Sequence, residues 1–148
     1  MRDTFRLDAS QIDLFRALID VFGTAFEATE VYCGAQPDDA YLGALLDRDD
    51  FIALVARQDG RVVGGLAAYV LHKFERRRSE IYIYDLAVSE AFRRSGVATR
   101  LIEELRTIAR QIGAYVIFVQ ADHGDDTAVA LYSRLGSRED VLHFDIAP

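Results

Sequence analysis

The sequence passes from an apolar strand through a short turn into a helix along the stretch Tyr84-Asp85-Leu86-Ala87-Val88-Ser89-Glu90-Ala91-Phe92-Arg93-Arg94-Ser95-Gly96-Val97-Ala98-Thr99-Arg100-Leu101. At the start of a helix several backbone N–H groups have no intrahelical partner, and they point together toward bound anions. Gly96 and Ala98 lack the bulk that would hold a phosphate away from the backbone, and Arg93 and Arg94 add positive charge. The segment therefore predicts a phosphate-binding turn.

The spacing of this turn excludes two familiar phosphate-binding loops. A P-loop requires G-x-x-x-x-G-K-[ST], and no lysine is present here; a dinucleotide fingerprint requires G-x-G-x-x-G, and only Gly96 is present. What remains is Arg93-x-x-Gly96-x-Ala98 after a strand that ends in Leu86-Ala87-Val88. This pattern resembles the pyrophosphate-binding segment of the GNAT superfamily, the acyl-CoA-dependent N-acetyltransferases.

A second segment strengthens the resemblance to GNAT enzymes. Residues 125–136 follow an apolar run and contain Leu131-Tyr132-Ser133-Arg134-Leu135-Gly136, which is similar to the other GNAT hallmark. The motif-level resemblance covers residues 50–146. Longer stretches, among them 79–88 and 113–126, resemble the type I aminoglycoside 3-N-acetyltransferases, which modify gentamicin-like antibiotics.

Length and composition predict one globular domain over residues 1–148. The chain is 51% hydrophobic, which is enough to bury a sizeable core. No window holds the roughly 18 consecutive apolar residues of a membrane span, and the first residues lack the apolar region of a signal peptide. We therefore expect a cytoplasmic protein that does not contact a membrane. Cys33 is the only cysteine, which excludes an intramolecular disulfide and a multi-thiolate metal site.

The charge of the chain favours a cationic partner over nucleic acid. The formal net charge is −7, and the isoelectric point is about 4.9. Residues 24–50 carry seven carboxylates against Arg48 alone, whereas basic residues gather at 73–78 and 93–94. An anionic cofactor at one end and a cationic substrate at the other would fit this division, although solvated helix faces also explain acidic clusters.

Periodicity and turn signals predict ten elements in the order β-α-α-β-β-β-α-β-α-β. A capping box at Ser10-Gln11-Ile12-Asp13 opens the first helix, and Asp59-Gly60 indicates a tight hairpin turn. The predicted strands are 5–7, 51–56, 61–71, 80–88, 114–121 and 141–146, and the predicted helices are 10–23, 37–46, 96–112 and 125–135. Because residues 114–121 are nearly all apolar, we expect them in the middle of the sheet. The pattern indicates an α/β (α+β) fold, with helices on both faces of one mixed sheet.

Acetyl transfer to an amine requires a neutral amine, stabilisation of an oxyanion and a proton for the departing thiolate, but no metal. The resemblance assigns the proton donor to Tyr132. The base is open: the position that carries a carboxylate in many GNAT enzymes is Tyr82 here, which leaves Asp85 and Glu80. Strand alternation places these two acids on opposite faces unless a bulge intervenes. Asp85 is favoured, and loss of the amine's proton to solvent is the alternative.

The resemblance also implies a set of binding residues. The strand end would offer backbone groups to the pantetheine arm and polarise the thioester, and the turn would hold the pyrophosphate. The expected cofactor-binding residues are Leu86, Ala87, Val88, Arg93, Arg94, Ser95, Gly96, Val97, Ala98, Thr99 and Asp125; the expected acceptor-binding residues are Glu80, Tyr84, Asp85 and Asp122. Asp125 stands where the superfamily often has asparagine, so N-capping of the following helix is its simpler role.

The leading hypothesis is thus transfer of an acetyl group from acetyl-CoA to the 3-amino group of an aminoglycoside, which would confer resistance. A GNAT enzyme for another cationic amine, such as a polyamine or a protein lysine, is the alternative within the enzyme class. A CoA-binding module without turnover is the alternative outside it. The sequence leaves the oligomeric state open and is compatible with a homodimer.

Overall fold

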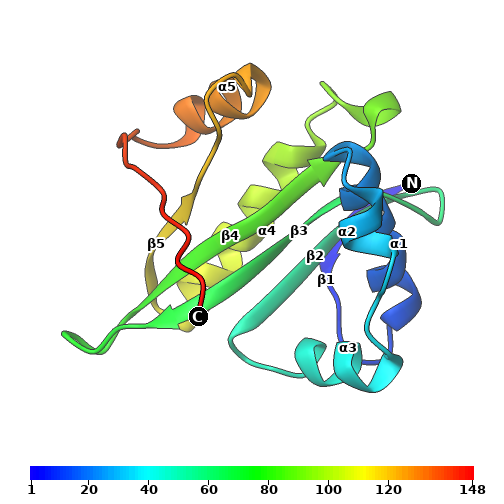
Figure 1. Cartoon of the computed structure of the whole chain (residues 1–148), viewed down its shortest axis with the longest axis horizontal. Coiled ribbons are helices and arrows are strands. Elements are labelled where there is room, and N and C mark those ends of the chain that lie inside the picture. Colours follow the sequence, from blue (N-terminus) through cyan, green and yellow to red (C-terminus); the bar gives the residue numbers. More distant parts are fainter.

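The computed structural model describes residues 1–148 and contains five strands and five α-helices around one sheet (Figure 1). In chain order the elements are β1 (Arg2–Arg6), α1 (Ile12–Ala25), α2 (Thr29–Cys33), α3 (Asp39–Leu46), β2 (Phe51–Gln58), β3 (Arg61–His72), β4 (Ser79–Val88), a 3₁₀ turn η1 (Glu90–Phe92), α4 (Val97–Ile112), β5 (Ala114–Val119) and α5 (Asp126–Leu135). The sheet order is β1-β2-β3-β4-β5, antiparallel from β1 to β4, with β5 parallel to β4. The predicted mixed sheet is confirmed.

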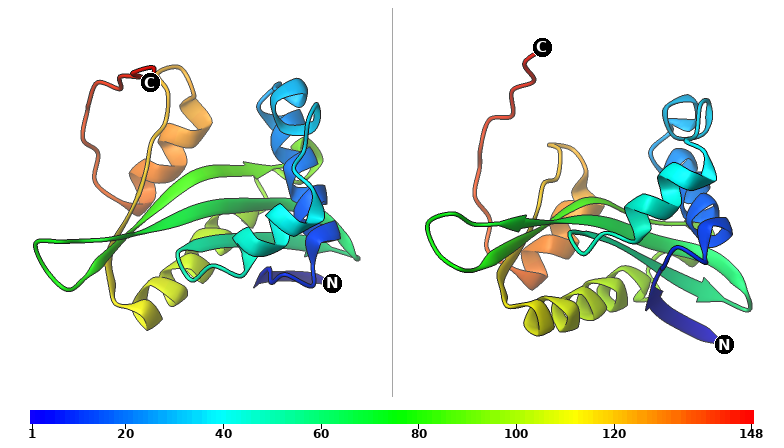
Figure 2. Two further views of the ribbon diagram at one scale, coloured as in Figure 1. Left: turned by 60° about the horizontal axis from the view of Figure 1, so that its bottom comes forward. Right: turned by 90° about the horizontal axis from the view of Figure 1, so that it is seen from below.

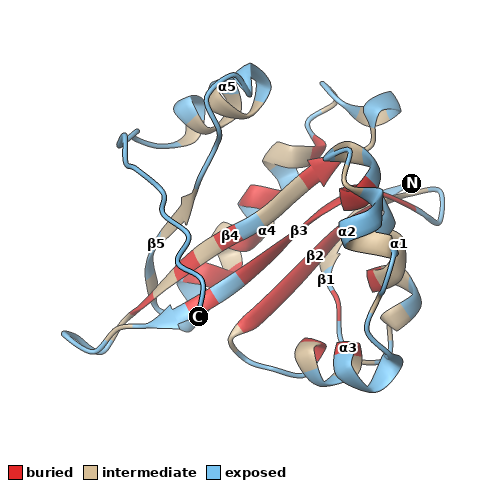
Figure 3. Ribbon diagram, in the orientation of Figure 1, coloured by how far each residue is buried: buried red, intermediate tan, exposed pale blue.

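Helices cover both faces of the sheet, as predicted (Figure 2). Strand β2 shows why its sequence is continuously apolar: Ile52 and Leu54 face α4, whereas Phe51 and Val55 face α1 and α3. Each face therefore has its own core, and the buried residues concentrate in the middle strands and the inner sides of α1 and α4 (Figure 3). No helix is long and apolar enough to cross a bilayer.

Turn and cap chemistry fixes most of the element boundaries. Asp59 and Gly60 both take positive φ, at 51° and 82°, which confirms the tight hairpin between β2 and β3. The Asp38 side chain accepts from the backbone N–H of Tyr41 and caps α3. The predicted box at residues 10–13 is wrong, because the reciprocal bonds form two residues earlier: Ser10 N–H donates to the Asp8 carboxylate, and Asp8 N–H donates to the side chain of Gln11.

The last third of the chain departs from the prediction in two ways. Strand β5 is the edge of the sheet and not its middle, because its outer side has no neighbour. Residues 141–146 form no strand, and residues 137–148 make no backbone hydrogen bond at all. Both errors have one cause: an apolar sequence shows that a segment can pair, but not which strands flank it or whether it pairs at all.

Candidate active site

A β-bulge at Tyr84 reshapes the middle of β4. Ile83 pairs with Ala68 and Asp85 pairs with Ala67, so the intervening Tyr84 has no partner on β3. The extra residue shifts the alternation of the strand by one position. Before the bulge Ile83 packs against α4, and after it Leu86 packs on that side while Ala87 faces α1. Asp85 therefore lies on the α1 face.

The Asp85 carboxylate is partly buried beneath α2. The Tyr32 hydroxyl donates a hydrogen bond of 2.9 Å to its Oδ2 atom. Burial raises the pKa of Asp85 above the usual value for aspartate, and the bond from Tyr32 opposes this rise. The Tyr32 hydroxyl itself has a raised pKa, because it is buried and lies beside that carboxylate, so it remains a donor. A carboxylate with a raised pKa at a strand bulge is suited to accept a proton.

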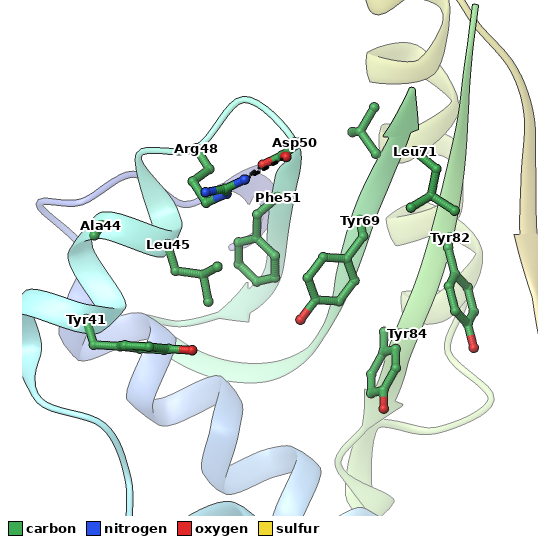
Figure 4. A pocket seen from close by; sticks show the side chains of 11 residues that line it. Tyr41, Ala44, Leu45, Arg48, Asp50, Phe51, Tyr69, Leu71, Tyr82 and Tyr84 are labelled. Carbon is green, nitrogen blue, oxygen red and sulfur yellow. Dashed lines mark hydrogen bonds and ion pairs between the residues drawn. The ribbon is translucent and has the colours of Figure 1, made fainter. Parts of the chain in front are cut away.

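An aromatic cleft of about 750 Å³ opens on the same face (Figure 4). Tyr41 of α3 and Tyr69 of β3 face each other across it, and Tyr84 forms its wall on the β4 side. The rings of Tyr69 and Tyr84 meet edge to face with centroids 5.8 Å apart, and Phe51 lies 5.3 Å from Tyr69. Aromatic faces attract cations. Asp85 does not line the cleft, but it follows the wall residue Tyr84 directly in β4. The cleft can therefore receive a hydrophilic ligand that carries positive charge.

Strands β4 and β5 separate beyond the pair Ile83 and Val119, which is the last in their register. Residues 84–88 of β4 continue without a neighbour on that side, and β5 ends (Figure 1). The predicted backbone-binding residues Leu86, Ala87 and Val88 all lie along this free stretch. A strand with an unpaired edge can accept an extended ligand as an added strand.

The turn before α4 has the geometry of an anion site. Gly96 takes φ 79°, and Arg94 takes φ 59°, a conformation that few non-glycine residues adopt. The first intrahelical bond runs from Arg100 N–H to the Gly96 carbonyl, so the N–H groups of Val97, Ala98 and Thr99 precede the hydrogen-bond ladder of the helix. A backbone of this form leaves three aligned donors for phosphate oxygens.

Side chains hold this turn in place. Arg93 donates through Nε to the carbonyl of Val88 at 3.0 Å, and Ser95 Oγ donates to the carbonyl of Phe92 at 2.5 Å. Arg2 and Arg100 both donate to the carbonyl of Ser95, at 3.4 and 3.5 Å. The Arg93 side chain thus ties the strand end to the turn, and Arg2 and Arg100 bring further positive charge there.

Tyr132 on α5 lies at the margin of the α4-side core. Burial, and secondarily the charge of Asp125, raise the pKa of Tyr132 to about 12. Its hydroxyl therefore keeps its proton at neutral pH and can act only as a donor or a neutral acceptor. Asp125 accepts from the backbone N–H of Ala128 at 3.2 Å and caps α5, in agreement with the simpler of its two expected roles.

Residues 15–137 match the model of the Acetyltransferase (GNAT) family. The chain belongs to this family. It is 28% identical over 105 residues to an uncharacterized N-acetyltransferase of Bacillus subtilis (strain 168), an alignment that covers 71% of this chain and 70% of the relative.

Two solved structures of aminoglycoside acetyltransferases from uncultured soil metagenomic samples resemble this GNAT chain closely. One is 53% identical with a TM-score of 0.98, and the match covers 100% of this chain and 99% of the other. The second, crystallised in complex with sisomicin, is 32% identical with a TM-score of 0.92, and the match covers 99% and 96%. Because the match to the first structure covers 100% of this chain, it includes the last dozen residues.

The arrangement fits the acyl donor of GNAT enzymes, acetyl-CoA. The N–H groups of residues 97–99 would hold its pyrophosphate, since Gly96 places no side chain over them. The free stretch of β4 would accept its pantetheine arm, and the donor would supply an acetyl group as a reactive thioester. The predicted cofactor residues 86–88 and 93–99 come from consecutive parts of one strand, turn and helix.

Two predicted acceptor residues lie apart from Asp85. Glu80 stands at the paired end of β4, where Tyr115 donates to it and Lys73 Nζ lies 3.6 Å from its Oε1. Asp122 borders a smaller cleft of about 330 Å³, together with Tyr84. Of the predicted acceptor residues, only Tyr84 lines the aromatic cleft, and Asp85 is its neighbour in β4. Asp122 shares the smaller cleft with Tyr84, and Glu80 is already paired.

Sequence reasoning did not find Tyr32, Tyr41 or Tyr69. Tyr32 lies in residues 24–36, which had no clear period and which fold in part into α2. No spacing connects Tyr32 to Asp85, because 53 residues separate them. The available signal was an aromatic residue within an irregular segment next to a cluster of acids.

Proposed function

We propose that this protein transfers the acetyl group of acetyl-CoA to the 3-amino group of a gentamicin-like aminoglycoside in the cytoplasm, and that it does so as a homodimer. The observation that carries the proposal is the aromatic cleft whose β4 wall is Tyr84, the residue directly before Asp85 at the start of the free stretch of β4. An aminoglycoside is a polyhydroxylated polycation, and the cleft offers aromatic faces and acceptor oxygens to such a ligand. The similarity to two aminoglycoside acetyltransferases supports the same substrate class.

In this proposal Asp85 accepts a proton from the substrate ammonium, directly or through water. Its raised pKa brings the carboxylate closer to the working pH and makes it a better base than an exposed aspartate. Tyr32 orients the carboxylate and limits the rise of its pKa. The neutral amine then attacks the thioester carbonyl and a C–N bond forms. The attacking nitrogen gives up its second proton to solvent, the carbonyl re-forms and the C–S bond breaks.

Groups of β4 and α5 stabilise the negative charge that develops on the carbonyl oxygen and on the departing sulfur. A backbone N–H of Ala87 or Val88 polarises the carbonyl oxygen as negative charge develops there. Tyr132 gives its proton to the departing sulfur, and its high pKa means that the proton is present beforehand. The tyrosinate is then reprotonated from solvent.

Recognition rests on charge as well as shape. The net charge of −7 attracts a polycation over long range. Part of the acidic cluster at residues 24–50 is already paired, since Asp39 meets Arg16 at 2.6 Å and Asp50 meets Arg48 at 2.7 Å. Glu27, Glu30, Asp47 and Asp49 form no ion pair and remain available to the amino groups of an antibiotic.

The proposal is tested by thiol release from acetyl-CoA with sisomicin or gentamicin, spermidine, and a lysine-containing peptide offered in parallel. We expect turnover with the aminoglycosides and little or none with the other two acceptors. NMR of the product should show the acetyl group on the 3-amino nitrogen. Preferred turnover of spermidine or the peptide would support the alternative amine. CoA binding without turnover of any acceptor would support a binding module.

A further inference from the structure

Two clefts meet at Tyr82 and Tyr84 of β4. Both residues line the aromatic cleft of about 750 Å³, and both also line the smaller cleft of about 330 Å³. Their rings stand side by side on the strand, with centroids 5.8 Å apart (Figure 4). A ligand longer than one ring can therefore occupy both clefts at once.

The aromatic cleft offers no unpaired charge to a ligand. The only charged residues that line it are Arg48 and Asp50. The Arg48 guanidinium donates through Nε and Nη2 to the two carboxylate oxygens of Asp50, at 2.7 and 2.8 Å. The two charges neutralise each other, so this cleft supplies aromatic faces to the acceptor but no free carboxylate for an additional ammonium group.

The smaller cleft, in contrast, has a free carboxylate. Asp122 lines it directly after β5, is exposed, and takes part in no side-chain hydrogen bond or ion pair within the protein. The loop that carries it is held by a turn, in which Asp125 N–H donates to the Asp122 carbonyl at 3.2 Å and Gly124 takes φ 91°. No lysine or arginine lines this cleft, and His143, which does, is 2.9 Å from Asp145. Asp122 is therefore the one carboxylate in either cleft that lacks a partner.

Tyr82 and Gln120 add a neutral polar wall to the smaller cleft. The Tyr82 hydroxyl donates to Oε1 of Gln120 at 2.7 Å, and the Tyr82 ring stacks on Phe118 with centroids 4.6 Å apart. Because Oε1 already accepts this bond, the amide N–H groups of Gln120 remain available to donate to hydroxyl oxygens of a sugar. The smaller cleft thus presents one anionic acceptor and one neutral donor, which suits an amino sugar.

We propose that Asp122 binds a second ammonium group of the acceptor, on a ring linked to the one that is acetylated. This inference rests on the proposed function. The reacting ring lies against Tyr84 with its amine directed toward Asp85, and the linked ring reaches into the smaller cleft. A charge-assisted hydrogen bond to Asp122 then selects acceptors in which two linked rings both carry amines. Asp122 is therefore a specificity-determining residue of the acceptor site.

The first test compares sisomicin with 2-deoxystreptamine, the central aminoglycoside ring, which carries the 3-amino group without a linked ring. Asp122→Asn should raise KM for sisomicin by about 5- to 10-fold and leave kcat unchanged, because the contact is made equally before and during the reaction. KM for 2-deoxystreptamine should be the same in Asp122→Asn and in wild type. Asp13→Asn is the matched control: it removes the same charge from an exposed position on α1 that lines neither cleft, and it should keep the wild-type KM for sisomicin.

The second test measures binding without turnover. Calorimetry with the CoA-bound protein should show the same 5- to 10-fold loss of sisomicin affinity in Asp122→Asn, about the effect of one charged hydrogen bond at a partly exposed site. CoA affinity should be unchanged, which shows that the variant is folded.

Three results would overturn the assignment of Asp122. These are an unchanged KM for sisomicin in Asp122→Asn, an equal rise in KM for 2-deoxystreptamine, and a fall in kcat at constant KM, which would place Asp122 in the reaction itself. In each of these cases sisomicin is still acetylated by the wild type, so the proposed reaction stands. A wild-type protein that neither binds nor acetylates sisomicin would contradict both the proposed function and this inference.

Discussion

The Tyr32 hydroxyl lies 2.9 Å from Oδ2 of Asp85 and donates a hydrogen bond to it, which links α2 to the bulge of β4. Burial alone would push the pKa of Asp85 up and keep the proton on it. The bond stabilises the ionised form and partly reverses that effect. In the proposed reaction Tyr32 is therefore a positioning residue, which would set the pH range in which Asp85 acts as a base.

Replacing Tyr32 with phenylalanine should move the acidic limb of the pH profile of kcat/KM to higher pH. The sign follows from the bond, which lowers the pKa of Asp85: its loss raises that pKa, so a higher pH is needed to ionise the carboxylate. In the Asp85→Asn variant, adding Tyr32→Phe should not change the pH profile of kcat/KM any further. An unchanged limb in Tyr32→Phe would show that Asp85 is not the base that titrates.

Asp85→Asn should lower kcat yet raise thermal stability at neutral pH. The pKa of Asp85 is higher in the folded protein than in the unfolded chain. The protonated carboxyl therefore favours folding at pH values below the pKa of the unfolded chain, and this contribution is lost as the pH rises through the pKa of the folded protein. At neutral pH the buried charge therefore costs stability, which the neutral amide removes. Melting temperatures at neutral and acidic pH measure this, and the gain should disappear in acid. A lower melting temperature at neutral pH would contradict the assigned burial penalty.

Tyr132→Phe should reduce kcat by about 10²- to 10⁴-fold, the usual contribution of a general acid. The ring still packs against the α4-side core, so CoA affinity measured by calorimetry should stay near wild type. Tyr115→Phe, at the far end of β5, is the matched control and should keep its turnover. Wild-type kcat in Tyr132→Phe would mean that another donor, such as water, protonates the thiolate.

Gly96→Val should weaken CoA binding by a large factor. A β-branched residue is strained at φ 79°, and its side chain would stand beside the aligned N–H groups. Within the protein its Cβ would meet only Nη1 of Arg100, at 3.5 Å, so the fold has room for it. Gly113→Val places the same strain at φ 75° at the other end of α4 and should lower stability alone. Equal CoA affinity in folded Gly96→Val and Gly113→Val would show that the pyrophosphate does not bind at this turn.

Tyr84→Ala should raise KM for the aminoglycoside more than it lowers kcat. A cation against an aromatic face contributes about 0.5–2 kcal/mol, which corresponds to roughly 2- to 30-fold in affinity. KM for acetyl-CoA should change little, because Tyr84 faces the aromatic cleft and not the turn before α4. Steady-state kinetics with each substrate varied in turn decide between these outcomes, and a selective rise in KM for acetyl-CoA would place Tyr84 in the other site.

The sequence was sufficient for elements whose causes are local. The Asp59-Gly60 hairpin, the start of α3 and the span of α4 between Gly96 and Gly113 each depend on the conformation of one or two residues. These features were predicted within a residue or two. The prediction of a capping box at residues 10–13 was wrong because Asp8 makes the corresponding bonds two residues earlier.

Features that depend on distant partners were not predictable in the same way. Alternation alone could not place Asp85, because the extra residue at Tyr84 is visible only in the register with β3. The bond from Tyr32 joins segments with no fixed spacing. Residues 114–119 and 141–146 both carry strand-like sequences, yet one is an edge and the other is unpaired.

A crystal structure of the protein with CoA and sisomicin would test the central claim most directly. We expect the pyrophosphate on the N–H groups of Val97, Ala98 and Thr99, and the antibiotic in the aromatic cleft. We also expect the 3-amino nitrogen within hydrogen-bond distance of Asp85 or of a water held by it. An antibiotic bound outside this cleft, or an acceptor nitrogen with no path to Asp85, would show that the proposed acceptor site is wrong.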